Sequence, residues 1–116
     1  MEPKDKFSLE QILTSCDLLL EAADKWIKKP EDMETNWILQ DACAFRIVQI
    51  GEYINRLSVD FLNSHPEIDW RNAVGMRNIL THNYGRVNPE ILWETIKENI
   101  PPLRDFCQAV LKEAKS

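Results

Sequence analysis

Apolar residues recur at steps of three and four along the first quarter of the chain, the spacing of one face of an α-helix. Ser8 with Gln11 matches a capping box at the start of this helix, and Pro30 is expected to stop it. The polar residues 31–35 are predicted to form a loop. The stripe consists of Leu9, Ile12, Leu13, Cys16, Leu19, Leu20, Ala23 and Ile27.

A second helix is predicted over about residues 36–57, and its apolar positions cover more than one face. A helix that is apolar on two sides is normally central to a bundle or shared with a partner chain. Polar residues interrupt it at steps of three, which predicts either a solvated stripe or a strip that lines a site. These residues are Arg46, Gln49, Glu52 and Asn55.

The second half of the chain continues the helical pattern. Residues 58–69 are expected to form a short helical turn and a loop, and residues 70–84 a helix. Asn88-Pro89-Glu90 provides an N-cap, a first-turn proline and an acid, so a new helix is predicted there. Pro101-Pro102 is expected to break or kink it before a last amphipathic helix. The predicted fold is all-α, an up-and-down bundle of four main helices with short additional helices.

Composition fits one domain over residues 1–116, with 44% hydrophobic residues and three glycines. The net charge of −5 argues against a general nucleic-acid binder. However, no acidic residue lies between Asp69 and Glu90, where Arg71, Arg77 and Arg86 occur. An acidic body with one locally basic segment suits a specific or partner-delivered RNA substrate.

Three distant cysteines without a C-x-x-C pair predict buried thiols rather than a zinc site or disulfides. The absence of a signal-peptide pattern and of a long apolar run predicts a cytoplasmic protein. Two distant histidines and no Gly-rich phosphate loop lead us to expect no metal and no cofactor. His65 is expected to be structural or solvent-facing, and the four tryptophans to anchor the core or an interface.

Residues 77–84 hold the candidate chemistry. Cutting RNA without a metal requires proton transfer and a fixed cation beside the phosphorane, to which histidine and arginine are suited. Arg77 and His82 have these side chains, and Asn78, four residues before His82, lies where it can orient the imidazole. Gly75 is expected to permit the close approach of another backbone. Because one histidine is few for two proton transfers, a symmetric dimer would supply both; spacing alone equally fits a capping or core histidine.

Residues 70–84, read with residues 87–96, resemble the HepT branch of the HEPN superfamily. Arg46 and the Ile50-Gly51-Glu52 run resemble the second helix of that family, and the similarity extends over about residues 8–112. The resemblance implies a HEPN-like helical domain. It also implies that Arg77 and His82 form the catalytic pair of a metal-independent endoribonuclease, with Asn78 as the polar residue that follows the arginine.

Family membership would further imply a homodimer whose two motifs face one cleft, with Arg46 and Glu52 as weaker candidates for lining it. Tyr84 matches the tyrosine that a cognate MntA-type minimal nucleotidyltransferase antitoxin modifies with AMP. The leading hypothesis is therefore the toxin of a type VII-like toxin–antitoxin pair that cleaves RNA by 2′-hydroxyl attack. One alternative is a noncatalytic subunit that binds nucleotide, RNA or the nucleotidyltransferase. Another is a helical scaffold in which Arg77 is salt-bridged, for example to Glu52, inside a closed interface.

Overall fold

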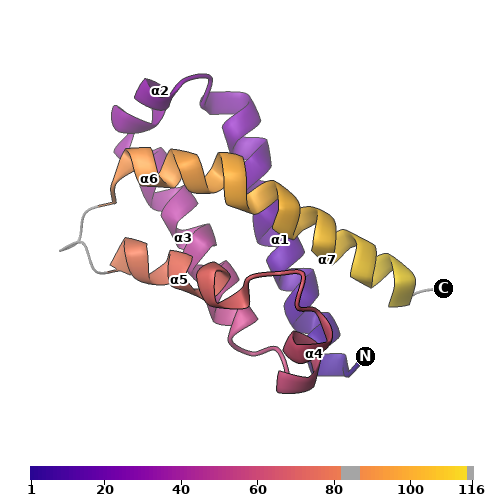
Figure 1. Cartoon of the computed structure of the whole chain (residues 1–116). Helices are drawn as coiled ribbons and strands as arrows, with labels where there is room; N and C mark the ends of the chain where they lie inside the picture. The colour runs from indigo at the N-terminus through magenta and orange to yellow at the C-terminus, as the bar shows by residue number, and fades with distance from the viewer. Residues whose placement is uncertain (82–86, 115–116) are drawn as a thin grey trace.

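The computed structural model is an all-α bundle, as the sequence predicts (Figure 1). It describes residues 1–81 and 87–114, and for residues 78–81 it describes the backbone alone. Within those ranges no strand is present. The helices are α1 (Pro3–Trp26), α2 (Pro30–Glu34), α3 (Trp37–Ile54), α4 (Val59–Ser64), α5 (Trp70–Thr81), α6 (Pro89–Glu94) and α7 (Ile100–Ala114), with a π-helical turn η1 (Thr95–Asn99) between the last two.

The first helix begins earlier than the sequence pattern predicts. Pro3 occupies its first turn, where a missing N–H costs nothing, so the predicted capping box at Ser8 is wrong. Ser8 is instead buried within α1. Pro30 opens α2, and the predicted loop at residues 31–35 is wrong for most of its length. The Asp32 carboxylate accepts hydrogen bonds from the backbone N–H groups of Lys28 and Lys29 at 2.9 and 3.2 Å, which fixes the tight connection from α1.

Two of the predicted helix starts are confirmed. The Asn36 side chain accepts from the N–H of Leu39 at 3.0 Å and caps α3. Asn88 accepts from the N–H groups of Glu90 and Ile91 and caps α6. Each cap satisfies backbone donors that a helix end would otherwise leave without a partner.

The proline pair does not break the last helix. α6, η1 and α7 follow one another as one continuous rod (Figure 1), so the predicted break at Pro101-Pro102 is wrong. The wider π-helical turn precedes the two prolines, and both lie in the first turn of α7. Because the wider turn replaces the regular i to i−4 hydrogen bonds just before the prolines, their missing N–H groups and their rings disturb fewer α-helical contacts.

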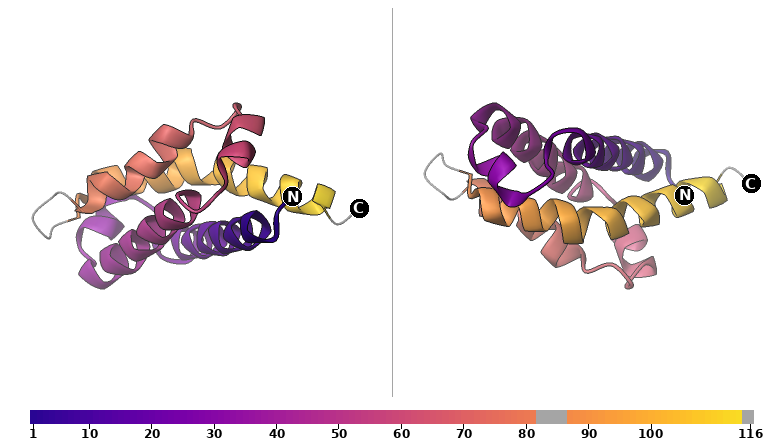
Figure 2. Two further views of the ribbon diagram at one scale, coloured as in Figure 1. Left: turned by 90° about the horizontal axis from the view of Figure 1, so that it is seen from below. Right: turned by 90° about the horizontal axis from the view of Figure 1, so that it is seen from above.

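The core lies among α1, α3 and the rod, and α5 packs onto α3. The views from below and from above place α1 and α5 on opposite sides of the rod (Figure 2). α5 contributes the buried side chains of Ala73 and Met76, which pack it against the rest of the bundle. The fully buried side chains include Leu9, Ile12, Leu19, Met33, Ile47, Ile50, Ile54, Leu92, Ile96 and Ile100, each worth about 1.5–3 kcal/mol if wholly removed from water.

The three cysteines are free and buried, as predicted. Burial raises the pKa of the Cys43 thiol to about 11 and that of Cys107 to about 12. Burial, with smaller contributions from Cys107 and Asp17, also raises the pKa of Cys16. These thiols are therefore protonated and packed as small apolar groups at neutral pH.

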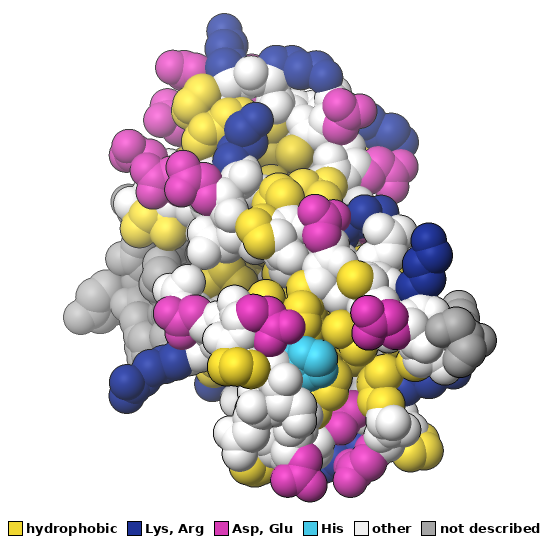
Figure 3. Space-filling view, turned by 45° about the vertical axis from the view of Figure 1, so that its right-hand side comes forward, with side chains coloured by type: hydrophobic (Ala, Val, Ile, Leu, Met, Phe, Trp, Pro, Cys, Tyr) yellow, Lys and Arg dark blue, Asp and Glu magenta, His cyan; other side chains and the backbone are white. Residues whose placement is uncertain are grey.

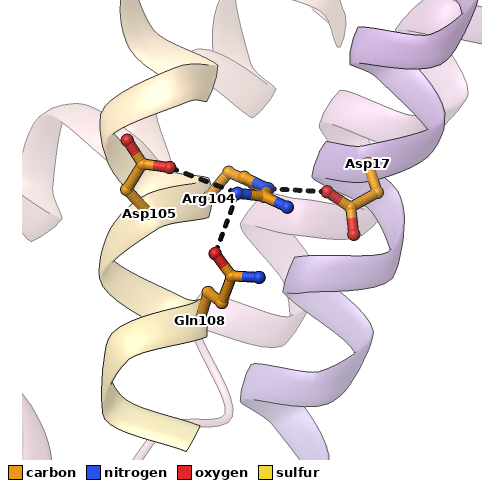
Figure 4. A network of polar contacts seen from close by, with 4 residues as sticks. All are labelled: Asp17, Arg104, Asp105 and Gln108. Atoms are coloured by element: carbon orange, nitrogen blue, oxygen red, sulfur yellow. Dashed lines mark hydrogen bonds and ion pairs between the residues drawn. The ribbon is translucent and has the colours of Figure 1, made fainter. Parts of the chain in front are cut away.

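Arg104 joins α7 to α1. Its Nε donates to Asp17 Oδ1 at 2.8 Å across the helix pair, and its Nη1 donates to Gln108 at 2.9 Å and to Asp105 at 3.4 Å (Figure 4). Those neighbouring carboxylates raise the pKa of Arg104 further, chiefly through the hydrogen bond with Asp17. This network is called the Arg104 clamp. Two of its residues, Asp17 and Gln108, directly follow the buried Cys16 and Cys107 in the sequence.

The second long helix is apolar on two sides, as predicted. α3 buries one face in the core, yet Trp37, Ile38 and Phe45 remain 69, 63 and 54% exposed. Trp26 and Trp37 are thus exposed rather than in the core, whereas Trp70 and Trp93 are partly buried against it. No described helix is long and apolar enough to cross a membrane.

Candidate functional site

Arg77 lies on α5, one turn before the helix ends at Thr81. Its guanidinium Nη1 donates to Glu52 Oε1 on α3 at 2.7 Å, a short charge-assisted hydrogen bond. The two side chains are 24 and 44% exposed, so the pair lies at the edge of the α3–α5 contact and not deep inside it. The structure thus brings together two of the sequence-predicted site residues, from segments 25 positions apart.

Gly51 sets the distance between these two helices. It is buried, and a Cβ placed on it would lie 2.8 Å from the Cβ of Arg77 and 3.4 Å from its Cδ. The stem of Arg77 therefore rests directly on the α3 backbone, which any side chain at Gly51 would prevent. Within this chain the close approach predicted at Gly75 does not occur, since a Cβ at Gly75 would meet nothing within 4 Å.

Arg46 lies on a different side of α3. It lines a small hollow with Leu18 and Ala22 of α1, and its guanidinium lies 5.3 Å from the centre of the Phe45 ring. Steps of three residues rotate by about 60° around a helix, so the polar positions do not form one straight strip. The structure therefore brings Glu52, and not Arg46, to Arg77.

The remaining predicted site residues lie wholly or partly outside the described atoms. Asn78 belongs to α5, but its side chain is outside the described atoms. His82 and Tyr84 lie outside the described residues, and so does Gly85, which was expected to end the helix. The described ends of α5 and α6 on either side of them lie at the end of the bundle opposite the two termini (Figure 1).

His65 is structural, as expected. Its ring packs against Phe61 and Phe106, with centroids 4.6 and 5.1 Å away, and its backbone carbonyl accepts from Trp70 Nε1 at 3.0 Å. Trp70 also contacts Phe106 edge-on. This aromatic cluster fixes where α5 begins, which in turn sets the position of Arg77 about two turns later.

A larger hollow, of about 530 Å³, lies away from Arg77. It is bounded by the start of α1, by α4 and by the end of α7, and the carboxylates of Glu2, Asp5 and Asp60 line it. Figure 3 shows acidic side chains on both sides of an apolar seam on this side of the molecule. Asp5 is fully engaged, accepting from Ser58 N–H at 2.7 Å and from Ser58 Oγ at 2.6 Å. Because phosphates are repelled by such a rim, this hollow is unsuited to RNA.

Over residues 1–81 and 87–114, no three His, Cys, Asp or Glu side chains are grouped as metal ligands. The described part of the site therefore consists of one cation, one carboxylate and one glycine from two packed helices. An arginine held in this way can bind phosphate or stabilise developing negative charge.

Comparison with known proteins decides the family. The family described as "Ribonuclease HepT-like" matches residues 12–110, which include the whole of α3, α5 and the segment between α5 and α6. The chain belongs to the HepT-like ribonuclease family.

Several curated relatives support this HepT-like assignment. "Putative RNase TTE0752" of Caldanaerobacter subterraneus subsp. tengcongensis is 36% identical over 107 residues, covering 92% of this chain and 94% of that protein. "Gamma-glutamylcyclotransferase and putative RNase MJ0434" of Methanocaldococcus jannaschii is 34% identical over 93% of this chain, but over only 48% of its own length. "Probable ribonuclease HepT" of Thermococcus cleftensis is 46% identical over 47% of this chain and 50% of that protein. No solved structure matches the chain significantly.

The HepT-like match confirms the fold and the family that the motif residues predict. It does not assign individual residues, so the roles of Arg77, His82, Asn78, Arg46, Glu52 and Tyr84 remain predictions. Gly51 is the residue whose part in the site the sequence analysis missed. The one indication of its role in the sequence was its position beside Glu52 in the Ile50-Gly51-Glu52 segment.

Proposed function

We propose that this HepT-like chain is a metal-independent endoribonuclease, the toxin of a type VII-like toxin–antitoxin pair. In this proposal His82 transfers protons between the 2′-hydroxyl, the leaving 5′-oxygen and solvent, and Arg77 stabilises the phosphorane. Asn78 orients His82. The products are a cyclic phosphate end and a free 5′-hydroxyl.

The observation that carries the proposal is the anchoring of Arg77. Its stem rests on Gly51 and its guanidinium binds Glu52 at 2.7 Å, while the side chain keeps 24% of its surface exposed. A catalytic cation must be held in position and still be reachable by a phosphate. No acid occurs between Asp69 and Glu90, so the segment that follows Arg77 offers RNA no local repulsion.

A homodimer is part of the proposal, because one motif supplies a single histidine. The exposed apolar face of α3 supports it. Ile38, Phe45 and Glu52 are seven residues apart in turn and so share one side of the helix. A second copy that covered Ile38 and Phe45 would lie next to the Glu52–Arg77 pair and could bring a second motif to the same cleft.

Control by an MntA-type nucleotidyltransferase antitoxin completes the proposal. Transfer of AMP from ATP to the Tyr84 hydroxyl, with release of pyrophosphate, would place bulk and negative charge two residues after His82. Both effects oppose the binding of RNA phosphate. After reaction with the antitoxin, this chain is expected to carry an added AMP group and to cut RNA no longer.

A noncatalytic role is the second candidate, and one observation favours it. The Arg77–Glu52 pair is the contact that the scaffold hypothesis predicts, and the net charge of −5 also suits a subunit that binds a protein partner. The scaffold hypothesis further requires that a second copy bury this pair, because both side chains are partly exposed in the single chain.

RNA cleavage by unmodified protein in EDTA tests the proposal. Intact mass is measured first to establish that no AMP is attached, and a His82→Ala variant is assayed in parallel. Cutting in EDTA that His82→Ala abolishes, with an unchanged circular dichroism spectrum, is the expected result. Absence of cutting by unmodified protein would favour the noncatalytic candidate, and cutting that survives in His82→Ala would remove His82 from the mechanism.

The dimer is tested separately by Phe45→Asp, with Val59→Asp as a matched control. Both residues are exposed, 54 and 69%, but Val59 lies on α4, away from the α3 face. Sedimentation should give a dimer for the parent and for Val59→Asp, and a monomer for Phe45→Asp. A dimer that withstands Phe45→Asp would place the interface elsewhere.

A further inference from the structure

The contact between Gly51 and Arg77 is closer than ordinary helix packing allows for any other residue. The 2.8 Å separation from a Cβ at Gly51 to the Cβ of Arg77 is shorter than real side chains adopt, so the glycine is required for the observed position of α5. Gly51 lies within the second half of α3, where glycine weakens a helix by about 0.5–1 kcal/mol relative to alanine. Of the two described glycines, Gly51 is the one that contacts Arg77, the proposed catalytic cation, and this destabilising residue occurs at that contact.

Glu52 is also in an unfavourable place for stability alone. It lies in the last turn of α3, which ends at Ile54, so its carboxylate faces the negative end of the helix dipole. This placement costs about 0.3–1 kcal/mol. A partly exposed ion pair returns about 0–1 kcal/mol. The pair with Arg77 thus contributes little to folding, and stability does not explain why a carboxylate occurs there.

We propose that Gly51 and Glu52 form a seat that positions Arg77 for contact with RNA phosphate. Gly51 sets the height of the arginine stem above α3, and Glu52 fixes the rotation of the guanidinium plane through its bond to Nη1. Because the guanidinium is planar, holding one nitrogen orients the whole group. Glu52 and Gly51 are positioning residues and act through Arg77. The inference rests on the proposed RNA cleavage, which requires a fixed cation.

Glu52 has a matched counterpart elsewhere in the molecule. Asp17 also joins two helices by binding an arginine, Arg104, at 2.8 Å, and it is 50% exposed against 44% for Glu52. Removing either carboxylate therefore disturbs a similar interhelical ion pair, but only one of the two holds Arg77. Asp17→Asn is the control for Glu52→Gln, and Gly75→Ala is the control for Gly51→Ala, because a Cβ at Gly75 meets nothing.

The kinetic experiment separates positioning from binding. Single-turnover cleavage of a mixed-sequence single-stranded RNA gives the rate, and its fully 2′-O-methylated counterpart gives the affinity. We expect Glu52→Ala and Gly51→Ala to slow cleavage about 10- to 100-fold, as a displacement of about 1 Å does, with affinity changed less than threefold. Glu52→Gln, which keeps an acceptor oxygen, should recover part of the rate. Asp17→Asn and Gly75→Ala should cut within twofold of the parent.

Cleavage by Glu52→Ala and Gly51→Ala at the parental rate would overturn the seat. Faster cleavage with tighter RNA binding would also overturn it, since Glu52 would then be a competitor of the phosphate and not a support. Equal slowing by Asp17→Asn would show that any interhelical ion pair has the same effect, and would again contradict the inference.

A measurement without RNA keeps the seat distinct from the proposed function. The guanidinium Nε–Hε resonance of Arg77, assigned by its loss in Arg77→Lys, reports how freely the group rotates. It should broaden or shift in Glu52→Ala and Gly51→Ala and stay unchanged in Asp17→Asn. If the parent never cuts RNA, the proposed function fails while this resonance still tests the seat. If the parent cuts RNA but the Arg77 resonance is unchanged in Glu52→Ala and Gly51→Ala, the positioning role of Gly51 and Glu52 is rejected and the proposed function stands.

Discussion

Two arginines among the described residues bridge neighbouring helices, and their surroundings differ. Arg104 of α7 reaches Asp17 of α1 and is also bound by Asp105 and Gln108 of its own helix (Figure 4). Arg77 of α5 reaches Glu52 of α3 across a glycine that lets its stem touch the backbone. Both ion pairs are short and partly exposed, so geometry of the pair alone does not separate a structural arginine from a functional one.

The difference lies in what surrounds each cation. Arg104 has two carboxylates against it, so the local charge is negative and a phosphate would be repelled. Arg77 is paired with Glu52 and is followed by a chain segment without acids up to Glu90. The close approach at Gly51 further indicates that the placement of Arg77 is specified more tightly than packing requires. Site candidates are therefore better distinguished by their neighbours than by the ion pair itself.

Removing the two arginines gives the largest expected contrast. Arg77→Ala should lower RNA cleavage about 100- to 1000-fold, as loss of a group that stabilises transition-state charge does. Arg104→Ala should leave the cleavage rate within threefold and lower the free energy of unfolding by about 1 kcal/mol. Cleavage assays and urea unfolding of both variants check this. Similar loss of cleavage in both variants would remove the distinction between the two arginines.

Alanine at the two described glycines should change stability in opposite directions. Gly51→Ala forces a methyl group against Arg77 and should lower the free energy of unfolding by about 1–3 kcal/mol. Gly75→Ala meets nothing within 4 Å in the middle of α5 and should raise it by about 0.5–1 kcal/mol. Urea unfolding midpoints decide between the signs. A stabilised Gly51→Ala would mean that α3 and α5 separate easily.

Alkaline pH should weaken the α1–α7 side through its buried thiols. The folded-state pKa of Cys107 is raised to about 12 from an ordinary 9.0, so above pH 9 the unfolded chain loses this proton first. Stability is complete below pH 9 and falls above it, by about 1 kcal/mol per thiol between pH 9 and 10. Above pH 9 the free energy of unfolding should fall less steeply with pH in Cys107→Ala than in the parent. An unchanged slope would show that the thiol titrates normally in the folded protein.

The smallest expected effect is the salt dependence of the Arg104 clamp. Asp17→Asn should cost about 0.2–1 kcal/mol at low salt, and most of this difference should disappear in 1 M sodium chloride. Thermal unfolding at two salt concentrations measures it. A salt-independent loss would indicate that Asp17 contributes through packing and not through charge.

The helices were predictable wherever the signal was local. Asn88 caps its helix, and the two apolar sides of α3 follow from residue spacing. The errors came from competing local signals and from distant contacts. Pro3 starts α1 before Ser8, and a π-helical turn lets the rod pass Pro101.

The candidate site was predictable only in part. Arg77 and Glu52 were both singled out, but their pairing depends on how α5 lies on α3, which spacing along the chain does not determine. Gly51 and Gly75 are both helical glycines in sequence, and only the fold shows which of them meets another helix. Arg46 was grouped with Glu52 because its spacing was read as a straight strip, whereas it lies towards α1.

The rod formed by α6, η1 and α7 also decides how this domain can be joined to others. It carries the chain from the end of the bundle where α5 ends and α6 begins to the opposite end, where the N-terminus also lies (Figure 1). Polypeptide attached at either terminus would therefore emerge far from Arg77. A longer protein can include this domain without covering Arg77, which is consistent with the relative from Methanocaldococcus jannaschii whose similar part makes up 48% of its length.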